Sequence, residues 1–154
     1  MFRFPIVICV LLSGFAVAAP IEDHWSPDPD TPYSVTFAKA AKMVEAKDYH
    51  RALPILKALA LDAPGDPDVY NLLGFASRKT GNLDAASKAY ARALFLSPDH
   101  LGALAYQGEL FLTLGDPAGA AGNHRRLEKL CPSPCAETDE LASSIAKWKA
   151  NQTQ

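Results

Sequence analysis

An internal repeat of 34 residues constrains the fold of this chain more than any other feature. Gly81-Asn82-Leu83-Asp84 recurs 34 positions later as Gly115-Asp116-Pro117-Ala118, and the related Lys47-Asp48-Tyr49-His50 lies 34 positions earlier. Such a period is typical of architectures in which each copy buries its apolar face against its neighbours. We therefore expect three copies over residues 33–134, with bounds 33–66, 67–100 and 101–134. The same spacing relates Ala52, Ala86 and Ala120; Pro64, Pro98 and Pro132; and Gly74 and Gly108.

Each copy is expected to contain two helices joined by a tight turn. In the second copy the first helix runs over about 68–80 and ends at Gly81, because a residue without a Cβ can adopt a left-handed conformation. Asn82 then caps the second helix with its side-chain oxygen. Asp116 has the same role in the third copy, and Pro117 follows at the first helical position, where its missing N–H is tolerated. The chain is predicted to be all-α.

The pattern resembles the tetratricopeptide repeat (TPR). The second copy matches closely, since the family's small and terminating positions are occupied by Gly74, Ala86, Ala93 and Pro98. Gly74 and its counterpart Gly108 correspond to the family position at which the two helices of a repeat approach closely. The third copy has His124 in place of an aromatic residue, and the first has Ala40 and Lys47 in place of the glycines. The resemblance implies a right-handed solenoid of three helix–turn–helix repeats.

A seventh helix is expected in the segment 135–154. Leu141, Ile145 and Trp148 make an apolar stripe along it, and Glu137 and Asp139 lie in its first turn, where the helix dipole favours acids. The resemblance implies that this helix caps the stack by covering the exposed face of the last repeat.

The first 32 residues are expected to lie outside the repeats. Residues 1–18 contain Arg3, an uncharged apolar run from Ile6 to Val17 and small residues after it, which is typical of a cleaved signal peptide. The alternative is a membrane anchor, but the run is shorter than the ~20 residues that span a bilayer. Residues 19–32 are acidic and rich in proline and predict a flexible tail. We expect a periplasmic or secreted protein with no stable membrane span after cleavage.

The composition excludes some classes of function. A formal charge of −2 gives no basic face for nucleic acid. The sequence lacks the G-x-S-x-G, G-x-x-x-x-G-K-[ST] and H-E-x-x-H motifs of hydrolases, phosphate-binding enzymes and zinc proteases. We therefore expect no enzymatic activity and no cofactor. The oligomeric state is left open.

The resemblance implies that ligands lie in a concave groove lined by the first helix of each repeat. A ligand there would be a protein or peptide held by apolar contacts and a few hydrogen bonds, for example an amphipathic helix. The carboxylate-binding clamp of some family members is not reproduced, because Phe37 and Ala41 occupy two of its places. Phe75 has an alternative role, packing between neighbouring helices. The predicted groove residues are Phe37, Val44, Asn71, Phe75, Arg78, Glu109 and Leu112.

Two cysteines, Cys131 and Cys135, follow the third copy. Cys9 would leave with the signal peptide, and an even pair in an exported protein predicts a disulfide that fixes the capping helix. Two alternatives stay open. Cys135, expected in the first turn of the capping helix, could be a reactive thiol of lowered pKa. The cysteines, with His124, could also bind a soft metal. These alternatives correspond to a metal- or thiol-handling protein instead of an interaction module.

Overall fold

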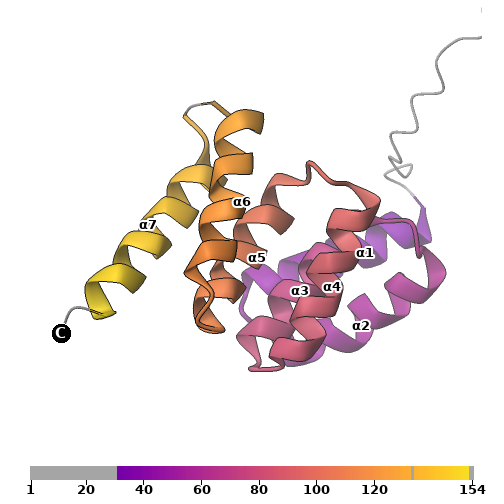
Figure 1. The fold of residues 1–154 in the computed structure, drawn as a ribbon. Coiled ribbons are helices and arrows are strands. Elements are labelled where there is room, and N and C mark those ends of the chain that lie inside the picture. The colour runs from indigo at the N-terminus through magenta and orange to yellow at the C-terminus, as the bar shows by residue number, and fades with distance from the viewer. Residues whose placement is uncertain (1–30, 133, 153–154) are drawn as a thin grey trace, which may run out of the picture.

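The structure, a computed structural model, describes residues 31–132 and 134–152, and within these ranges it contains helices and no strands. Consecutive helices pack as three hairpins, and α7 follows at one end of the stack, with α1 and α2 at the other (Figure 1). The predicted all-α solenoid is confirmed. The predicted signal peptide and residues 19–30 lie outside the described residues. The helices are α1 (Pro32–Glu45), α2 (Tyr49–Asp62), α3 (Pro67–Lys79), α4 (Leu83–Leu96), α5 (Leu101–Thr113), α6 (Pro117–Leu130) and α7 (Ala136–Gln152).

Local side-chain chemistry fixes where the helices begin. Asn82 accepts a hydrogen bond from the Ala85 N–H, and Asp116 accepts one from the Gly119 N–H, as their positions predict. Thr31 caps α1 with Pro32 as the first helical residue, so the helix begins inside the segment that was predicted as tail.

The turn inside each hairpin has the same backbone geometry. Gly81 and Gly115 have φ angles of 82° and 79°, and Lys47 has a φ angle of 61° at the equivalent position of the first repeat. Glycine adopts this left-handed conformation without steric penalty, whereas a residue with a Cβ does not. The first repeat thus keeps the turn despite lacking the glycine.

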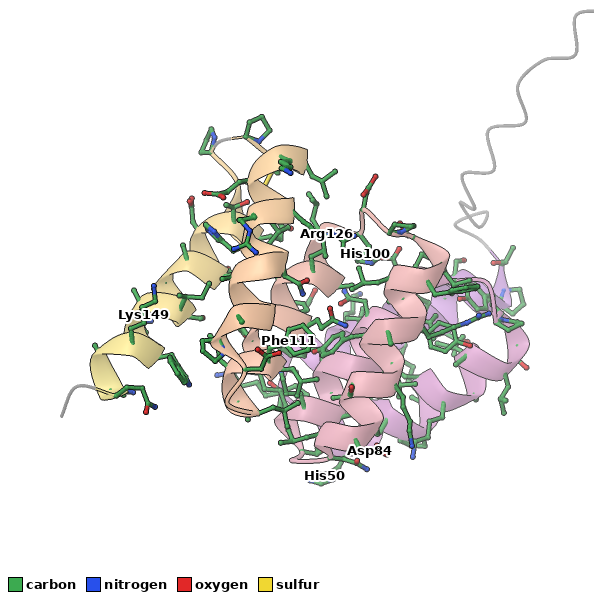
Figure 2. The ribbon with its side chains drawn as sticks, viewed as in Figure 1. His50, Asp84, His100, Phe111, Arg126 and Lys149 are labelled. Carbon is green, nitrogen blue, oxygen red and sulfur yellow. A yellow bond between two sulfur atoms is a disulfide. The ribbon has the colours of Figure 1, made fainter. Side chains whose placement is uncertain are left out.

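Equivalent arginines join successive repeats. Arg92 on α4 donates a hydrogen bond to the Pro64 carbonyl at 2.9 Å, and Arg126 on α6 donates one to the Pro98 carbonyl at 2.5 Å. Both carbonyls lie just beyond the end of the preceding second helix, where backbone acceptors have no partner within the helix. Figure 2 shows Arg126 beside His100 at the turn between α4 and α5. These contacts set the register in which the hairpins stack.

Gly74 and Gly108 occupy equivalent positions of successive repeats but pack against different partners. A Cβ on Gly74 would lie 2.7 Å from the ring of Tyr90, so α3 and α4 approach as the family position implies. A Cβ on Gly108 would instead lie 2.6 Å from the Leu141 side chain on α7. His124 occupies the position equivalent to Tyr90, and its ring lies 3.7 Å from Glu128 on its own helix. The capping helix thus supplies the side chain that packs on Gly108.

The capping helix begins at Ala136, so Cys135 lies just before its first turn and not within it. The Cys135 carbonyl accepts a hydrogen bond from the Asp139 N–H at 3.0 Å, as expected for the residue that precedes a helix. Leu141 is fully buried, and Leu141 and Ile145 pack against Leu104 and Ala105 of α5. The predicted stripe therefore covers the last repeat, with Trp148 only partly buried.

Candidate functional site: the inner groove

A groove of about 430 Å³ lies along the first helices of the three repeats. Helices α1, α3 and α5 contact one another in sequence, so each contributes to one continuous surface. The start of α2 also contributes. The lining residues are Ala41, Val44, Glu45, Lys47, Tyr49, Leu72, Phe75, Lys79 and Tyr106.

Three aromatic side chains from three different repeats meet in this groove. The Phe75 ring centroid lies 4.7 Å from that of Tyr106 and 6.1 Å from that of Tyr49, in tilted and edge-on arrangements respectively. All three rings are only partly buried. The Lys79 Nζ lies 5.1 Å from the Phe75 centroid, within the range of a cation–π contact. The groove thus presents a partly exposed aromatic wall with a cation beside it.

An ion pair lies beneath the aromatic wall. The Arg78 guanidinium donates to a carboxylate oxygen of Glu109 at 2.5 Å, joining α3 to α5. Only 11% of the Arg78 side chain is exposed. The Ser144 hydroxyl, on α7, donates to the other Glu109 oxygen at 3.3 Å. Both charges are therefore engaged within the protein, and α7 is tied to the groove through Glu109.

Two tyrosines near this ion pair have perturbed acidity. Burial of Tyr90 raises the pKa of its hydroxyl, and the nearby positive charge of Arg78 opposes that shift only in part. Burial also raises the pKa of Tyr106, with further contributions from Glu140 and Glu109. Both hydroxyls are therefore protonated at neutral pH, and the Tyr106 side chain in the groove lining carries no charge.

The structure brings together only part of the predicted groove. Val44 and Phe75 line it, and Arg78 and Glu109 form its ion-paired base. Phe37 packs against the core of the first repeat. Asn71 is buried against α5, where a Cβ on Gly102 would lie 3.1 Å from its amide nitrogen. Leu112 is buried as well.

Sequence reasoning missed six of the lining residues, namely Glu45, Lys47, Tyr49, Leu72, Lys79 and Tyr106. Leu72 and Tyr106 are separated by 34 residues, so they occupy the same position of successive repeats. That spacing is a signal in the sequence that could have identified them. Asn71, which was predicted to line the groove, precedes Leu72 by one residue. Its side chain faces the neighbouring helix α5 instead of the groove.

The cysteine pair lies at the junction of α6 and α7. The Cα atoms of Cys131 and Cys135 are 5.8 Å apart, within the range that a disulfide bridges, and the sulfur atoms face each other. Within residues 31–132 and 134–152, no group of three or more histidine, cysteine or acidic side chains is placed to hold a metal ion. His124 lies next to Glu128 instead of joining the cysteines.

The comparison with family models finds one similarity, in the central part of the chain. Residues 43–106 match a model described as tetratricopeptide repeat. This central segment of the chain is therefore similar to tetratricopeptide repeats. The match covers α2 to α4 and parts of α1 and α5, including most residues that line the groove.

Solved TPR structures share this architecture. MamA from Desulfovibrio magneticus RS-1 is 27% identical with a TM-score of 0.61, over 65% of this chain and 56% of that one. The chain thus spans little more than half the length of that MamA chain. The Yersinia enterocolitica chaperone SycD, in complex with a peptide of the translocator YopD, is 18% identical with a TM-score of 0.65, over 77% and 92% of the two chains.

A further TPR structure is the first TPR of Spaghetti (RPAP3) bound to the HSP90 peptide SRMEEVD. It is 19% identical with a TM-score of 0.66, over 77% of this chain and 93% of that one. At such identities these likenesses show the shared fold. No curated protein matched the sequence. Among the described helices, none combines the length and apolar character that crossing a membrane requires.

Proposed function

We propose that this protein is a non-catalytic interaction module that holds a segment of another protein in its inner groove. The observation that carries the proposal is the aromatic wall of Tyr49, Phe75 and Tyr106. Aromatic side chains dominate the binding energy of protein interfaces because they bury a large area with little loss of conformational freedom. The three rings also pack against core residues, and each keeps part of its surface in the groove, where a ligand could cover it.

The charges around the wall favour an amphipathic partner. Lys47 and Lys79 lie on the groove surface with exposed side chains and outnumber the one exposed acid of the lining, Glu45, while Arg78 and Glu109 neutralise each other. A segment that places apolar side chains on Phe75 and Tyr106, and carboxylates towards the two lysines, fits this arrangement. Peptide complexes of the SycD and RPAP3 repeats support a peptide ligand for the same fold.

We further propose that the protein is exported after removal of residues 1–18 and acts in the assembly of an exported complex. Support comes from the signal-like sequence and from the cysteine pair, since disulfides persist in oxidising compartments. The Cys131–Cys135 disulfide would hold α7 in place, and through Ser144 it would hold Glu109 at the base of the groove.

Affinity capture from native cell extracts tests the groove. The variant Phe75→Ala/Lys79→Ala is expected to lose a partner that the parent protein recovers. Phe95→Ala is the matched control, because Phe95 is 75% exposed on α4 and does not line the groove. Equal recovery by the parent protein and the groove variant, with the loss confined to Phe95→Ala, would reject the groove as the binding surface.

A further inference from the structure

A second surface depression lies on the outward side of α1, at the end of the stack. It has a volume of about 550 Å³. It lies on the side of α1 opposite Ala40 and Val44, which are buried in the core. In the described part of the chain no helix precedes α1, so this side has no neighbouring repeat to cover it. Its lining residues are Ser34, Val35, Ala38, Lys39, Lys42, Met43, Ala46 and Asp48.

This outer face of α1 is apolar and positively charged. Val35, in the first turn of the helix, is 61% exposed on this side. Lys39 and Lys42 lie one turn apart on the same side, and neither forms an ion pair within the described residues. Asp48, the one acid in the lining, is paired with Arg51 at 3.1 Å. The face therefore offers two unpaired cations beside an apolar strip.

The segment directly before α1 is complementary to this face. Residues 19–30 contain Glu22, Asp23, Asp28 and Asp30, no lysine or arginine, and one tryptophan, Trp25. Opposite charges would attract this segment to the two lysines, and Trp25 supplies a large apolar surface.

The length of the segment matches the length of α1. Pro27 and Pro29 favour an extended backbone with a rise of about 3.1 Å per residue, so Asp28 reaches ~12 Å and Trp25 ~22 Å from Pro32. Along α1, with a rise of about 1.5 Å per residue, Lys39 lies ~10 Å and Met43 ~16 Å from Pro32. A chain that reverses direction before Pro32 can therefore place Asp28 at Lys39 and Trp25 at Met43.

We propose that residues 21–30 dock along the outer face of α1 and act as the N-terminal cap of the solenoid. Asp28 and the acids before it pair with Lys39 and Lys42, and Trp25 covers Met43. In this arrangement the segment closes the first repeat as α7 closes the third, and it prevents a second copy from stacking on α1. The proposal does not depend on what the inner groove binds.

Tryptophan fluorescence of the full chain tests the docking. The protein has two tryptophans, so Trp148→Phe leaves Trp25 as the only reporter. Trp25 is expected to emit at shorter wavelength than in a synthetic peptide of residues 19–30 and to resist quenching by acrylamide. Lys39→Glu/Lys42→Glu should lower the docked-to-free ratio about tenfold, as expected for two exposed ion pairs. Combining Asp28→Lys with Lys39→Glu exchanges the two charges of the proposed pair, so it should restore the protection of Trp25 from acrylamide.

The matched control is Lys147→Glu/Lys149→Glu, which makes the same charge change on exposed residues of α7 and should leave Trp25 protected. Circular dichroism checks that the variants stay helical. If Trp148→Phe does not fold, quenching of the parent chain at low and high ionic strength supplies the same comparison. Accessibility of Trp25 equal to that in the peptide would overturn the proposal. So would a dimer that Lys39→Glu/Lys42→Glu dissociates while Trp25 stays accessible, because the face would then bind a second copy.

Discussion

Replacing Lys47 with glycine is expected to stabilise the protein. Lys47 has a φ angle of 61°, and the equivalent Gly81 and Gly115 have 82° and 79°. The turn also has the same hydrogen bonds in each repeat. In the first repeat the Lys47 N–H donates to the Val44 carbonyl at 3.0 Å, and the next N–H donates to the Met43 carbonyl at 2.8 Å. The backbone is therefore the one that glycine adopts most readily.

The expected gain follows from two opposing terms. A residue with a Cβ in the left-handed region costs roughly 1–2 kcal/mol, which the substitution removes. Glycine makes the unfolded chain more flexible, which takes back about 0.5–1 kcal/mol. The free energy of unfolding should rise by about 0.5–1 kcal/mol, which corresponds to roughly 1–4 °C in the melting temperature of a chain of this size.

Chemical and thermal denaturation followed by circular dichroism measure this change. Lys57→Gly is the matched control, because Lys57 is exposed within α2 and glycine in a helix interior should lower stability by about 1 kcal/mol. Gly81→Lys tests the converse and should destabilise the second repeat. A loss of stability in Lys47→Gly as large as that in Lys57→Gly would refute the reasoning about the turn.

Three further substitutions test the packing, the junction and the buried hydroxyl. Gly74→Ala should lower the free energy of unfolding by about 1–3 kcal/mol, because the new Cβ would lie 2.7 Å from the buried Tyr90 ring, whereas Gly65→Ala meets open space and should change little in the same denaturation assay. Cys131→Ser should lower stability by about 2 kcal/mol, the value for a short disulfide loop, and retain most helical circular dichroism; complete unfolding would show that the repeats depend on this link. Burial raises the pKa of Tyr90, so its contribution to stability is present below pH ~10, the usual tyrosine pKa, and is lost as the pH rises above it. Denaturation midpoints from pH 8 upwards should therefore fall less steeply in Tyr90→Phe, and an unchanged slope would contradict the burial argument.

The helices were largely predictable from the sequence because their ends depend on local chemistry. Gly81 and Asn82 specify a turn and a cap through their own backbone and side chain, and the structure has both at those positions. The close approach at Gly74 was also predicted, because Tyr90 is in the same repeat. The 34-residue spacing then predicted the equivalent turns and caps in the other copies.

Contacts between repeats could be predicted less well. The partner of Gly108 is Leu141, a residue outside the repeat pattern, and no local signal in the sequence links the two. The pairing of Arg78 with Glu109 depends on how far α3 and α5 are rotated relative to each other. The same rotation places Leu72 and Tyr106 on the groove and turns Asn71 into the interface between helices. Helical periodicity identifies a face but not the neighbour that will cover it.

Site-specific photo-crosslinking in native cells tests the central claim, that the inner groove binds a segment of another protein. Benzoylphenylalanine is introduced in place of Leu72 on the groove and, separately, in place of Phe95 on α4. The account predicts one crosslinked species from position 72 that is absent from position 95 and is suppressed by Lys79→Ala. A crosslinked partner from position 95 with none from position 72 would contradict it.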